Sequence, residues 1–284
     1  MIRTSRQLKD LIRNLSQSSG IPQYLLIRRY MMDRFLERLS VSPYREKFIL
    51  KGGMLVSEIV GIHARATKDI DTTVKGLPLT KEHMKNVIDD IISVDVQDNI
   101  IFRVTSVDTI MDEADYEGIR IGLEARFDGS VTPMKIDIST NDIITPQEVV
   151  YEYKLMLEDR TISILAYPLE TVLAEKIETL ISRAETNTRM RDFYDIHILS
   201  QSCESEIEYQ ILGEALAATA DRRGTTAILD QAESVLNALE SSFRMEELWK
   251  RYQAKNSYTE SFSWQEVMSS TRKLCLKSGL NVSQ

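Results

Sequence analysis

The sequence is poor in the residues that mark specialised classes of protein. Its 284 residues include only 2 Cys, 11 Gly and 6 Pro, which excludes a disulfide-stapled fold, a collagen-like chain and a low-complexity chain. Cys203 and Cys275 lie far apart and match no metal-ligand or redox spacing, which indicates free thiols in a reducing compartment. No run approaches the ~20 apolar residues of a membrane span, and residues 1–20 lack the apolar centre of a signal peptide. We therefore expect a cytoplasmic protein with no membrane partner.

A net positive charge is also missing, since 35 Lys and Arg stand against 43 Asp and Glu, a balance of −8. An acidic average argues against a general nucleic-acid coat, which needs a basic surface. The charge is unevenly distributed, however, because residues 1–50 hold ten basic side chains and four acidic ones. This N-terminal segment is either a phosphate-seeking surface or the solvated face of ordinary helices.

Hydrophobic periodicity predicts both helices and strands. Apolar residues three and four apart predict helices at 5–16 and 22–39, the second opened by Pro22, whose missing N–H suits a helix start. The period then shortens to two, most clearly where Ile119 and Ile121 alternate with polar residues. The predicted strands are 48–50, 70–74, 100–107, 118–127 and 134–139, with a helix at 80–93 between them.

After Pro146 the pattern becomes helical again, with helices from Pro168 to about Ala184 and from about Met190 to Leu199. Further helices extend to Leu276, with breaks near Gly224 and Asn256. The sequence therefore predicts an α+β fold in three parts. These are a basic helical N-terminal arm at 1–45, an α/β core at 46–150 and a helical C-terminal domain at 151–284.

Two aspartates open the predicted strand at 70–74. Because alternate strand residues face the same way, Asp69 and Asp71 present both carboxylates on one side while Ile70 points into the core. Carboxylates this close repel each other unless a cation lies between them, which favours a hard divalent ion, Mg²⁺ or Mn²⁺. The alternative is a pair of exposed acids at a strand edge.

Asp137 lies on the polar face of the predicted strand at 134–139, opposite Ile136 and Ile138. If this strand neighbours that of Asp71, Asp137 completes a cluster of three carboxylates. Such a cluster suits two-metal phosphoryl or nucleotidyl transfer, with Asp137 as a metal ligand or as the general base for the attacking hydroxyl. The alternative is an unrelated exposed strand face.

Gly52 and Gly53 follow a short apolar strand and precede a helix-like stretch. Glycines at such a turn let the backbone approach a phosphate, and the following helix N-terminus offers N–H groups to it. Arg65, Thr67 and Lys68 lie just before the two aspartates and can add phosphate contacts. The plain alternatives are an ordinary turn and a polar loop.

Lys176 falls on or beside the apolar stripe of the helix that Pro168 opens, so its ammonium needs a partner. A triphosphate or an active-site acid would serve, and the alternative is a stem packed at the edge of the stripe with its head in water. Asp192 and Asp195 share one face of the next helix, where each can form a structural ion pair with Arg189 or Arg191, and this is the simpler interpretation for Asp192.

These motifs together resemble the AbiEii family of nucleotidyltransferase toxins, the toxin component of type IV toxin–antitoxin and phage abortive-infection systems. The similarity covers most of residues 8–200. It is carried by Ser42-Pro43-Tyr44-Arg45, Leu50-Lys51-Gly52-Gly53, Arg65-Ala66-Thr67-Lys68-Asp69-Ile70-Asp71, Lys135-Ile136-Asp137-Ile138, the run from Tyr167 to Lys176, and the run from Arg189 to Ile196.

The resemblance implies a polymerase-β-like nucleotidyltransferase core with a mixed sheet, and a helical C-terminal domain that completes the nucleotide site. The roles that it implies are phosphate binding at Gly52 and Gly53, Mg²⁺ binding at Asp69 and Asp71, triphosphate contact at Lys176, and completion of the site by Asp192 and Asp195. The superfamily motif is commonly Gly-Ser, whereas this chain has Gly53 followed by Met54, so the hydroxyl that would touch a phosphate is missing.

The implied activity is transfer of a nucleotide from an NTP to an RNA acceptor such as the 3′ end of tRNA, which blocks translation and growth. The implied partner is a cognate antitoxin. Two other functions stay open at this point: a small-molecule nucleotidyltransferase of the antibiotic-modifying kind, and a non-catalytic relative that binds a nucleotide or a partner protein. Labelling total RNA with each NTP would distinguish them.

Overall fold

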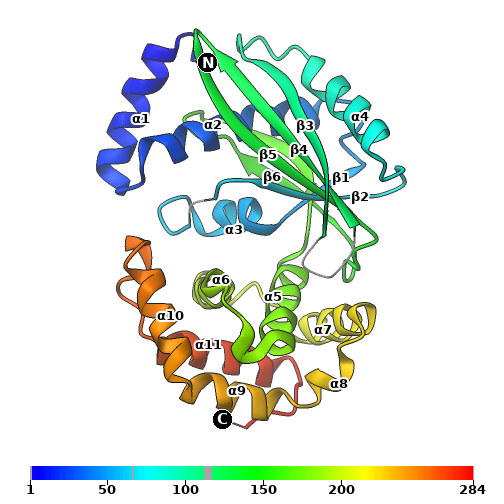
Figure 1. Ribbon diagram of the computed structural model, residues 1–284, viewed down its shortest axis with the longest axis vertical. Coiled ribbons are helices and arrows are strands. Elements are labelled where there is room, and N and C mark those ends of the chain that lie inside the picture. Colours follow the sequence, from blue (N-terminus) through cyan, green and yellow to red (C-terminus); the bar gives the residue numbers. More distant parts are fainter. Residues whose placement is uncertain (1, 66, 112–116, 284) are drawn as a thin grey trace. The chain divides into compact units, whose positions relative to one another are not determined.

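The computed structural model describes residues 2–65, 67–111 and 117–283 (Figure 1). The chain forms two compact units. Unit 1 consists of Met1–Asp142 and Glu148–Ala166, and unit 2 consists of Ile143–Gln147 and Tyr167–Gln284. The boundary expected between residues 150 and 151 lies inside the second segment of unit 1.

Unit 1 is built on a mixed sheet. Among the residues described, it contains seven strands in the order β3-β4-β5-β2-β1-β7-β6. β2 is parallel to β5 and β1 is parallel to β7, while the other neighbouring pairs are antiparallel. The strands are β1 (Phe48–Lys51), β2 (Ile70–Val74), β3 (Ile101–Met111), β4 (Glu117–Phe127), β5 (Ser130–Thr140), β6 (Val149–Lys154) and β7 (Thr161–Ala166).

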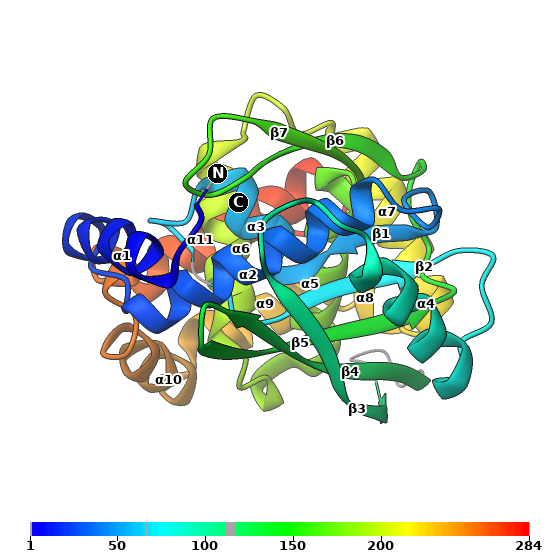
Figure 2. The same ribbon diagram turned by 90° about the horizontal axis from the view of Figure 1, so that it is seen from above.

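The helices of unit 1 are α1 (Ser5–Ser19), α2 (Gln23–Ser40), α3 (Gly52–Val60) and α4 (Lys81–Ser93). α2 runs across the sheet and packs against β5 and β7 (Figure 2). α3 packs against β1 and β2, and α4 packs against β3. The sheet is therefore covered by helices that follow or precede its strands along the chain.

Local sequence explains where two of these helices begin and end. The Thr4 hydroxyl accepts a hydrogen bond from the Gln7 N–H at 3.2 Å, which satisfies one of the free N–H groups at the start of α1. Gly20 ends the same helix with a φ of 71°, a left-handed conformation that glycine adopts without strain. Thr80 caps α4 in the same way as Thr4 caps α1, by accepting from the His83 N–H.

The elements predicted up to residue 140 are confirmed, but the region after Pro146 is not helical at first. It forms the antiparallel pair of β6 and β7, which adds two strands to the sheet of unit 1. β6 is an edge strand, and its Val149 and Val150 are exposed, so its apolar residues do not mark a buried face. Solvent exposure of apolar side chains at the sheet edge therefore hid the strand period.

Unit 2 is helical, as predicted for the chain beyond Pro168. The predicted breaks near Gly224 and Asn256 are confirmed, since α7 ends at Arg223 and α10 ends at Gln253. The helices are α5 (Leu169–Arg183), η1 (Ala184–Thr186), α6 (Met190–Ser202), α7 (Tyr209–Arg223), α8 (Thr226–Leu229), α9 (Ala232–Ser241), α10 (Phe243–Gln253), η2 (Ser257–Thr259) and α11 (Trp264–Lys277).

The core of unit 2 lies around α5 and α6. α5 packs against α6 and α7, and its predicted apolar stripe is buried at Val172, Ile177 and Leu180. α6 packs against α11, where the rings of Phe193 and Trp264 lie 5.0 Å apart between centroids. Both cysteines are free, as expected, and both are buried. Across the three described ranges of the chain, no helix is both long enough and apolar enough to cross a membrane.

Candidate active site

Strand register places four charged residues in a row across unit 1. Lys51 on β1 lies opposite Asp71 on β2, and Asp71 lies opposite Asp137 on β5. Asp137 in turn lies opposite Arg120 on β4. Directly paired residues of neighbouring strands project to the same side of a sheet, about 5 Å apart. The hypothesis that the strand of Asp137 neighbours the strand of Asp71 is therefore confirmed.

Asp71 lies against the N-terminus of α3. Its Oδ2 accepts a hydrogen bond from the Gly53 N–H at 3.3 Å, in the favourable field of the helix dipole. Gly52 has a φ of 65°, and a Cβ there would lie 2.8 Å from the Cβ of Asp71. Only glycine therefore lets the turn approach this carboxylate so closely. Asp69 lies one residue before β2, in a bend.

Thr67 occupies the space beside Gly53. A Cβ on Gly53 would lie 2.8 Å from the Oγ1 of Thr67 and 3.1 Å from the Nη2 of Arg65. Both residues lie in the loop before β2, as the alternative of a polar loop had it, but their side chains are buried. A serine at position 53 would therefore collide with Thr67. The departure from the common Gly-Ser motif has a local cause, and a threonine hydroxyl stands where the serine would be.

Arg120 is a site residue that the sequence does not single out. Its Nε and Nη2 donate to Oδ1 and Oδ2 of Asp137 at 2.7 and 2.6 Å. That hydrogen bond is the main reason why the pKa of Arg120 is raised, and the charges of Asp69 and Asp71 raise it further. Periodicity shows only that Arg120 lies on the polar face of β4. The partner depends on strand order, which no local signal reveals.

Lys51 is the second residue of the row that was not predicted. Its ammonium donates to Oδ2 of Asp142 at 2.6 Å, and the Ser139 hydroxyl donates to the same oxygen at 2.8 Å. Lys51 immediately precedes Gly52, so its place beside the glycine turn was a usable signal. The row thus has two aspartates at its centre, with Lys51 at one end and Arg120 at the other.

Carboxylate oxygens are the donors that this row offers to a cation. Asp69 and Asp71 supply the hard oxygen ligands that Mg²⁺ prefers. Both oxygens of Asp137 are engaged by Arg120. Within the part of the chain that the structure describes, no group of three or more His, Cys, Asp or Glu side chains is placed to hold a metal ion. Strand order thus brings Asp71 and Asp137 to neighbouring positions, but the predicted cluster of three acids is interrupted by an ion pair.

Lys176 forms the centre of a buried ion cluster in unit 2. Its ammonium lies 2.9 Å from Oδ1 of Asp192 and 2.8 Å from Oδ2 of Asp195. Burial by itself would lower the pKa of Lys176, but the two carboxylates outweigh burial and raise it. The pKa of Asp192 is lowered because Lys176 and Arg189 outweigh the opposing effect of burial. Arg189 Nε lies 2.9 Å from Asp192 Oδ2, so the simpler interpretation of Asp192 holds alongside its contact with Lys176.

Three arginines of α2 fit neither interpretation of the basic N-terminal segment. Arg29, Arg34 and Arg38 are buried, so they form neither a phosphate-seeking surface nor a solvated face. Arg38 is paired through both Nη atoms with Asp98, at 2.8 and 2.7 Å. Burial would raise the pKa of Asp98, but the hydrogen bonds from Arg38 outweigh it and the pKa is lowered.

Arg29 joins α2 to two other parts of unit 1. Its Nε lies 2.9 Å from Asp33, and its Nη2 lies 2.7 Å from Glu58 on α3. Asp33 also accepts from the Tyr153 hydroxyl on β6 at 2.6 Å. Arg34 similarly reaches Glu158, in the turn between β6 and β7. The positive charges of Arg29, Arg34 and Arg38 therefore form ion pairs inside unit 1, and these hold α2 against the sheet.

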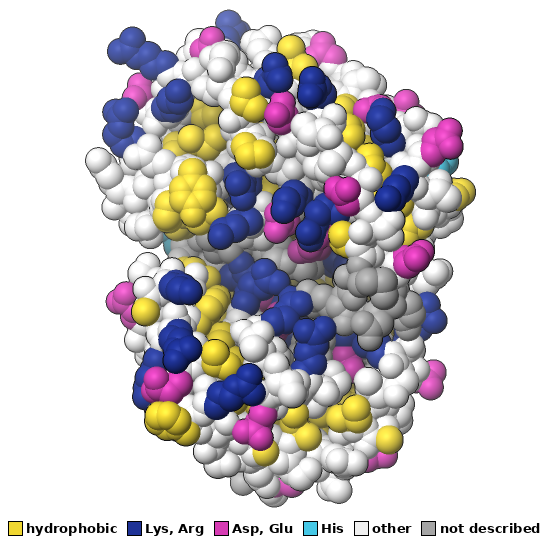
Figure 3. Space-filling view, viewed as in Figure 1, with side chains coloured by type: hydrophobic (Ala, Val, Ile, Leu, Met, Phe, Trp, Pro, Cys, Tyr) yellow, Lys and Arg dark blue, Asp and Glu magenta, His cyan; other side chains and the backbone are white. Residues whose placement is uncertain are grey.

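Four exposed basic residues of the N-terminal segment lie on and before α1, namely Arg3, Arg6, Lys9 and Arg13, and two more, Arg45 and Lys47, lie between α2 and β1. Arg6, Lys9 and Arg13 are spaced three and four apart, which places them on one face of the helix. Asp10 pairs with Arg13 at 3.3 Å. Figure 3 shows basic side chains gathered over the region of α1.

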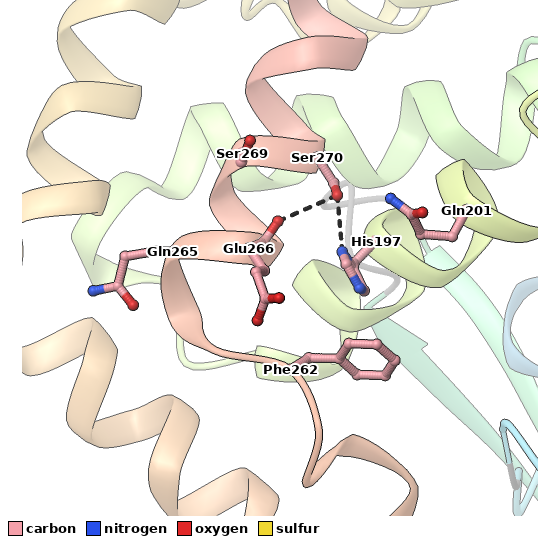
Figure 4. A pocket seen from close by; sticks show the side chains of 7 residues that line it. All are labelled: His197, Gln201, Phe262, Gln265, Glu266, Ser269 and Ser270. Atoms are coloured by element: carbon pink, nitrogen blue, oxygen red, sulfur yellow. Dashed lines mark hydrogen bonds between the residues drawn. The ribbon is translucent and has the colours of Figure 1, made fainter.

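A pocket of about 590 Å³ lies between α6 and α11 in unit 2 (Figure 4). The Ser270 hydroxyl donates to the Glu266 carbonyl at 3.2 Å, so it accepts from Nδ1 of His197, 2.8 Å away. This arrangement leaves Nε2 of His197 as a buried acceptor without a hydrogen-bond partner among the described residues. Burial lowers the pKa of His197, partly offset by the charge of Glu266. His197 is thus a neutral, helix-packing histidine.

Solved structures that are similar to this chain indicate its fold. MenT4, a nucleotidyltransferase toxin from Mycobacterium tuberculosis, has a similar structure, with a TM-score of 0.55 at 14% identity over 97% of this chain and 99% of that one. A protein from H. pylori described as a nucleotidyltransferase aligns with a TM-score of 0.48 at 15% identity over 92% of this chain and 95% of that one. The fold is that of the nucleotidyltransferases.

The family follows from the sequence. The model of the nucleotidyl transferase AbiEii toxin of the type IV toxin–antitoxin system matches residues 34–269. The chain therefore belongs to the AbiEii family of nucleotidyltransferase toxins, whose type IV system implies a partner antitoxin. The resemblance drawn from the motifs is confirmed. No curated protein matches the chain.

Proposed function

We propose that the protein is a Mg²⁺-dependent toxin that transfers a nucleotide from an NTP to an RNA acceptor, the 3′ end of tRNA, and so blocks translation. One observation carries the proposal. Asp71 and Asp137 lie opposite each other on parallel strands, and Asp71 also meets the glycine turn at the start of α3. Acids and helix N–H groups are thereby concentrated where a metal–triphosphate complex needs both.

The donor set supports a divalent cation. Asp69 and Asp71 offer only oxygen ligands, which suit Mg²⁺ or Mn²⁺. Gly52 leaves the space beside Asp71 free of a side chain. When bound, the metal would neutralise phosphate charge and lower the pKa of the attacking hydroxyl. The chain's own contribution is to fix Asp71 through the Gly53 N–H and to keep Asp137 beside it through strand pairing.

Arg65 and Thr67 extend this phosphate-binding turn in the proposal. They lie next to Gly53, where their donor groups are oriented by burial. In unit 2 we assign Lys176 to the triphosphate, with Asp192 and Asp195 holding its ammonium in place. The matching motifs of the AbiEii family support these assignments.

The helix α1 is the surface that we assign to the RNA backbone. Its basic face is exposed, whereas Arg29, Arg34 and Arg38 of α2 are buried. Ser5, at the start of α1, donates to Asp128 in the turn between β4 and β5. Asp137 lies seven residues beyond Ser130 on β5, which corresponds to about 23 Å along the strand. An RNA acceptor arm is long enough to extend from this helix to the carboxylates.

Labelled NTPs test the proposal directly. The protein is incubated with each α-labelled NTP, Mg²⁺ and total RNA, and the labelled species are separated. We expect one NTP to label tRNA-sized RNA, and we expect Asp69→Ala and Asp71→Ala to abolish both labelling and growth inhibition. Asp89→Ala, which removes an exposed aspartate that pairs with Lys85 on α4, is the matched control and keeps full activity.

Other labelling patterns would overturn specific parts of the proposal. Labelling of small molecules alone would favour the antibiotic-modifying alternative, and undiminished RNA labelling by Asp71→Ala would exclude the carboxylate site. Labelling that persists in EDTA would exclude the metal. Nucleotide binding without any labelled product would identify a non-catalytic relative.

Charge reversal tests the assignment of α1. We expect Arg6→Glu combined with Lys9→Glu to raise the KM for RNA about tenfold and to leave NTP affinity unchanged. The slope of log RNA affinity against log salt concentration is expected to fall by the amount that corresponds to about two lost phosphate contacts. Reversal of two exposed basic residues elsewhere in unit 1, Lys81 and Arg103, is the control. An unchanged salt dependence would remove α1 from the RNA interface.

A further inference from the structure

Arg120 binds both carboxylate oxygens of Asp137, a contact that has no role in the nucleotide transfer proposed above. The two side chains form a forked pair, with Nε and Nη2 donating to separate oxygens at 2.7 and 2.6 Å. A fork of this kind is the strongest arrangement between an arginine and a carboxylate. Asp137 therefore has both of its oxygens engaged before any substrate arrives.

Arg120 lies in the field of more negative charge than its one partner, Asp137, provides. Asp69 and Asp71 also act on the guanidinium, so one cation faces three carboxylates. The register of β4, β5 and β2 fixes this crowding, because Arg120, Asp137 and Asp71 lie side by side on adjacent strands. Carboxylates that lie near one another repel unless positive charge compensates them. Arg120 supplies that charge in this structure.

The pair is also able to open. The Arg120 side chain is 37% exposed and that of Asp137 is 20% exposed, in contrast to the ion pairs of α2, which are almost completely buried. An arginine at such a position turns into solvent at small cost, because its guanidinium remains hydrated there. The strand backbones that carry both residues need not move.

We propose that Arg120 is a positioning residue that stands in for the divalent cation, so that metal binding must displace it from Asp137. The metal-free site is then kept compact by the guanidinium, and Asp137 becomes available only when the metal replaces it. This inference rests on the proposed function, because it takes Asp69, Asp71 and Asp137 as the acids that receive the metal.

Direct Mn²⁺ binding, without NTP or RNA, tests the inference. Free Mn²⁺ is measured by electron paramagnetic resonance during titration of the wild-type protein and of Arg120→Gln. Removing the competing hydrogen bonds is expected to tighten Mn²⁺ binding roughly ten- to hundredfold. Arg126→Gln removes an arginine from the same strand, where it pairs with Glu124, and is expected to leave the affinity unchanged.

A double-variant comparison separates displacement from a general effect of charge. If Arg120 competes for Asp137, the gain from Arg120→Gln disappears when Asp137 is already replaced by Asn. A gain of equal size with and without Asp137 would show that Arg120 acts only through long-range charge and would overturn the inference. So would equal Mn²⁺ affinities of the wild type and Arg120→Gln.

The same titration separates this inference from the proposed function. Binding of Mn²⁺ to the wild type, lost in Asp71→Asn but unaffected by Arg120→Gln, would leave the metal-dependent function in place and exclude the role of Arg120. Failure of every variant to bind Mn²⁺, together with RNA labelling in EDTA, would exclude both.

Discussion

Asp71 and Asp137 face each other across the parallel pairing of β2 and β5, although β3 and β4 separate them along the chain. The parallel arrangement is possible because the chain returns to β5 through the β3–β4 hairpin before it pairs with β2. The result is an acidic pair on rigid strands, next to a glycine turn that supplies backbone N–H groups. Its geometry depends on few mobile parts, which suits a site that must hold charged phosphates in place.

The space beside Gly53 predicts a compensating pair of substitutions. Gly53→Ser places its side chain against Thr67, so we expect NTP affinity to fall about tenfold or more. Adding Thr67→Ala to Gly53→Ser removes the collision and supplies a hydroxyl again, so affinity is expected to recover. Equilibrium binding of a fluorescent NTP measures both effects. Wild-type affinity in the single Gly53→Ser variant would contradict this account of the turn.

The buried pair of Arg38 and Asp98 predicts a large loss of stability. Arg38→Ala leaves Asp98 buried without its forked partner, and we expect the free energy of unfolding to fall by about 3–5 kcal/mol. Arg13→Ala, which breaks an exposed pair with Asp10, is expected to change it by less than about 1 kcal/mol. Urea denaturation measures both. Similar small losses would show that α2 does not depend on its buried charges.

The cluster around Lys176 predicts coupled effects on folding. Lys176→Ala leaves two neighbouring carboxylates buried and repelling, so the free energy of unfolding is expected to fall by about 3–5 kcal/mol. Adding Asp192→Asn removes one of these charges and is expected to restore part of the loss. Denaturation of the single and double variants measures the coupling, and strictly additive losses would contradict the cluster.

The same variants examine the assignment of Lys176 to the triphosphate. Under the conditions where Lys176→Ala remains folded, we expect weaker NTP binding with unchanged Mn²⁺ binding. Asp192→Asn keeps the ammonium and is the control, with a smaller expected loss of NTP affinity. Unchanged NTP affinity in folded Lys176→Ala would restrict this lysine to a structural role.

Burial of His197 predicts a pH dependence of stability. The pKa of His197 is lowered in the folded state, so the unfolded chain binds a proton first as the pH falls. The free energy of unfolding should therefore decline below pH ~6.5, with a slope of at most about 1.4 kcal/mol per pH unit from this group. His197→Asn should flatten the decline, whereas His63→Asn, at an exposed position, should not. Identical pH profiles for all three proteins would exclude the effect.

Periodicity predicted most of the elements because most of them have one buried face. The strand β4, with Ile119 and Ile121 inside, and the helix α5, with Val172 and Ile177 inside, are examples. β6 was not predicted, since Val150 is exposed at the sheet edge and carries no burial signal. β7 was missed although its buried Ile162 and Ile164 alternate with exposed residues. The burial of Arg29, Arg34 and Arg38 was not predicted for a related reason, because the sequence does not show whether an arginine has a buried acidic partner.

Sequence by itself determined the family, the acids of the candidate site and the glycine turn, because these depend on residue type and on short spacings along the chain. Only the tertiary structure decided which strand lies beside which. Strand order set Asp137 next to Asp71 and paired Asp137 with Arg120. The packing of α2 engaged Arg29, Arg34 and Arg38 in internal ion pairs, which leaves α1 as an exposed basic surface. Such pairings form between segments distant in the chain, and a local pattern holds no information about their partners.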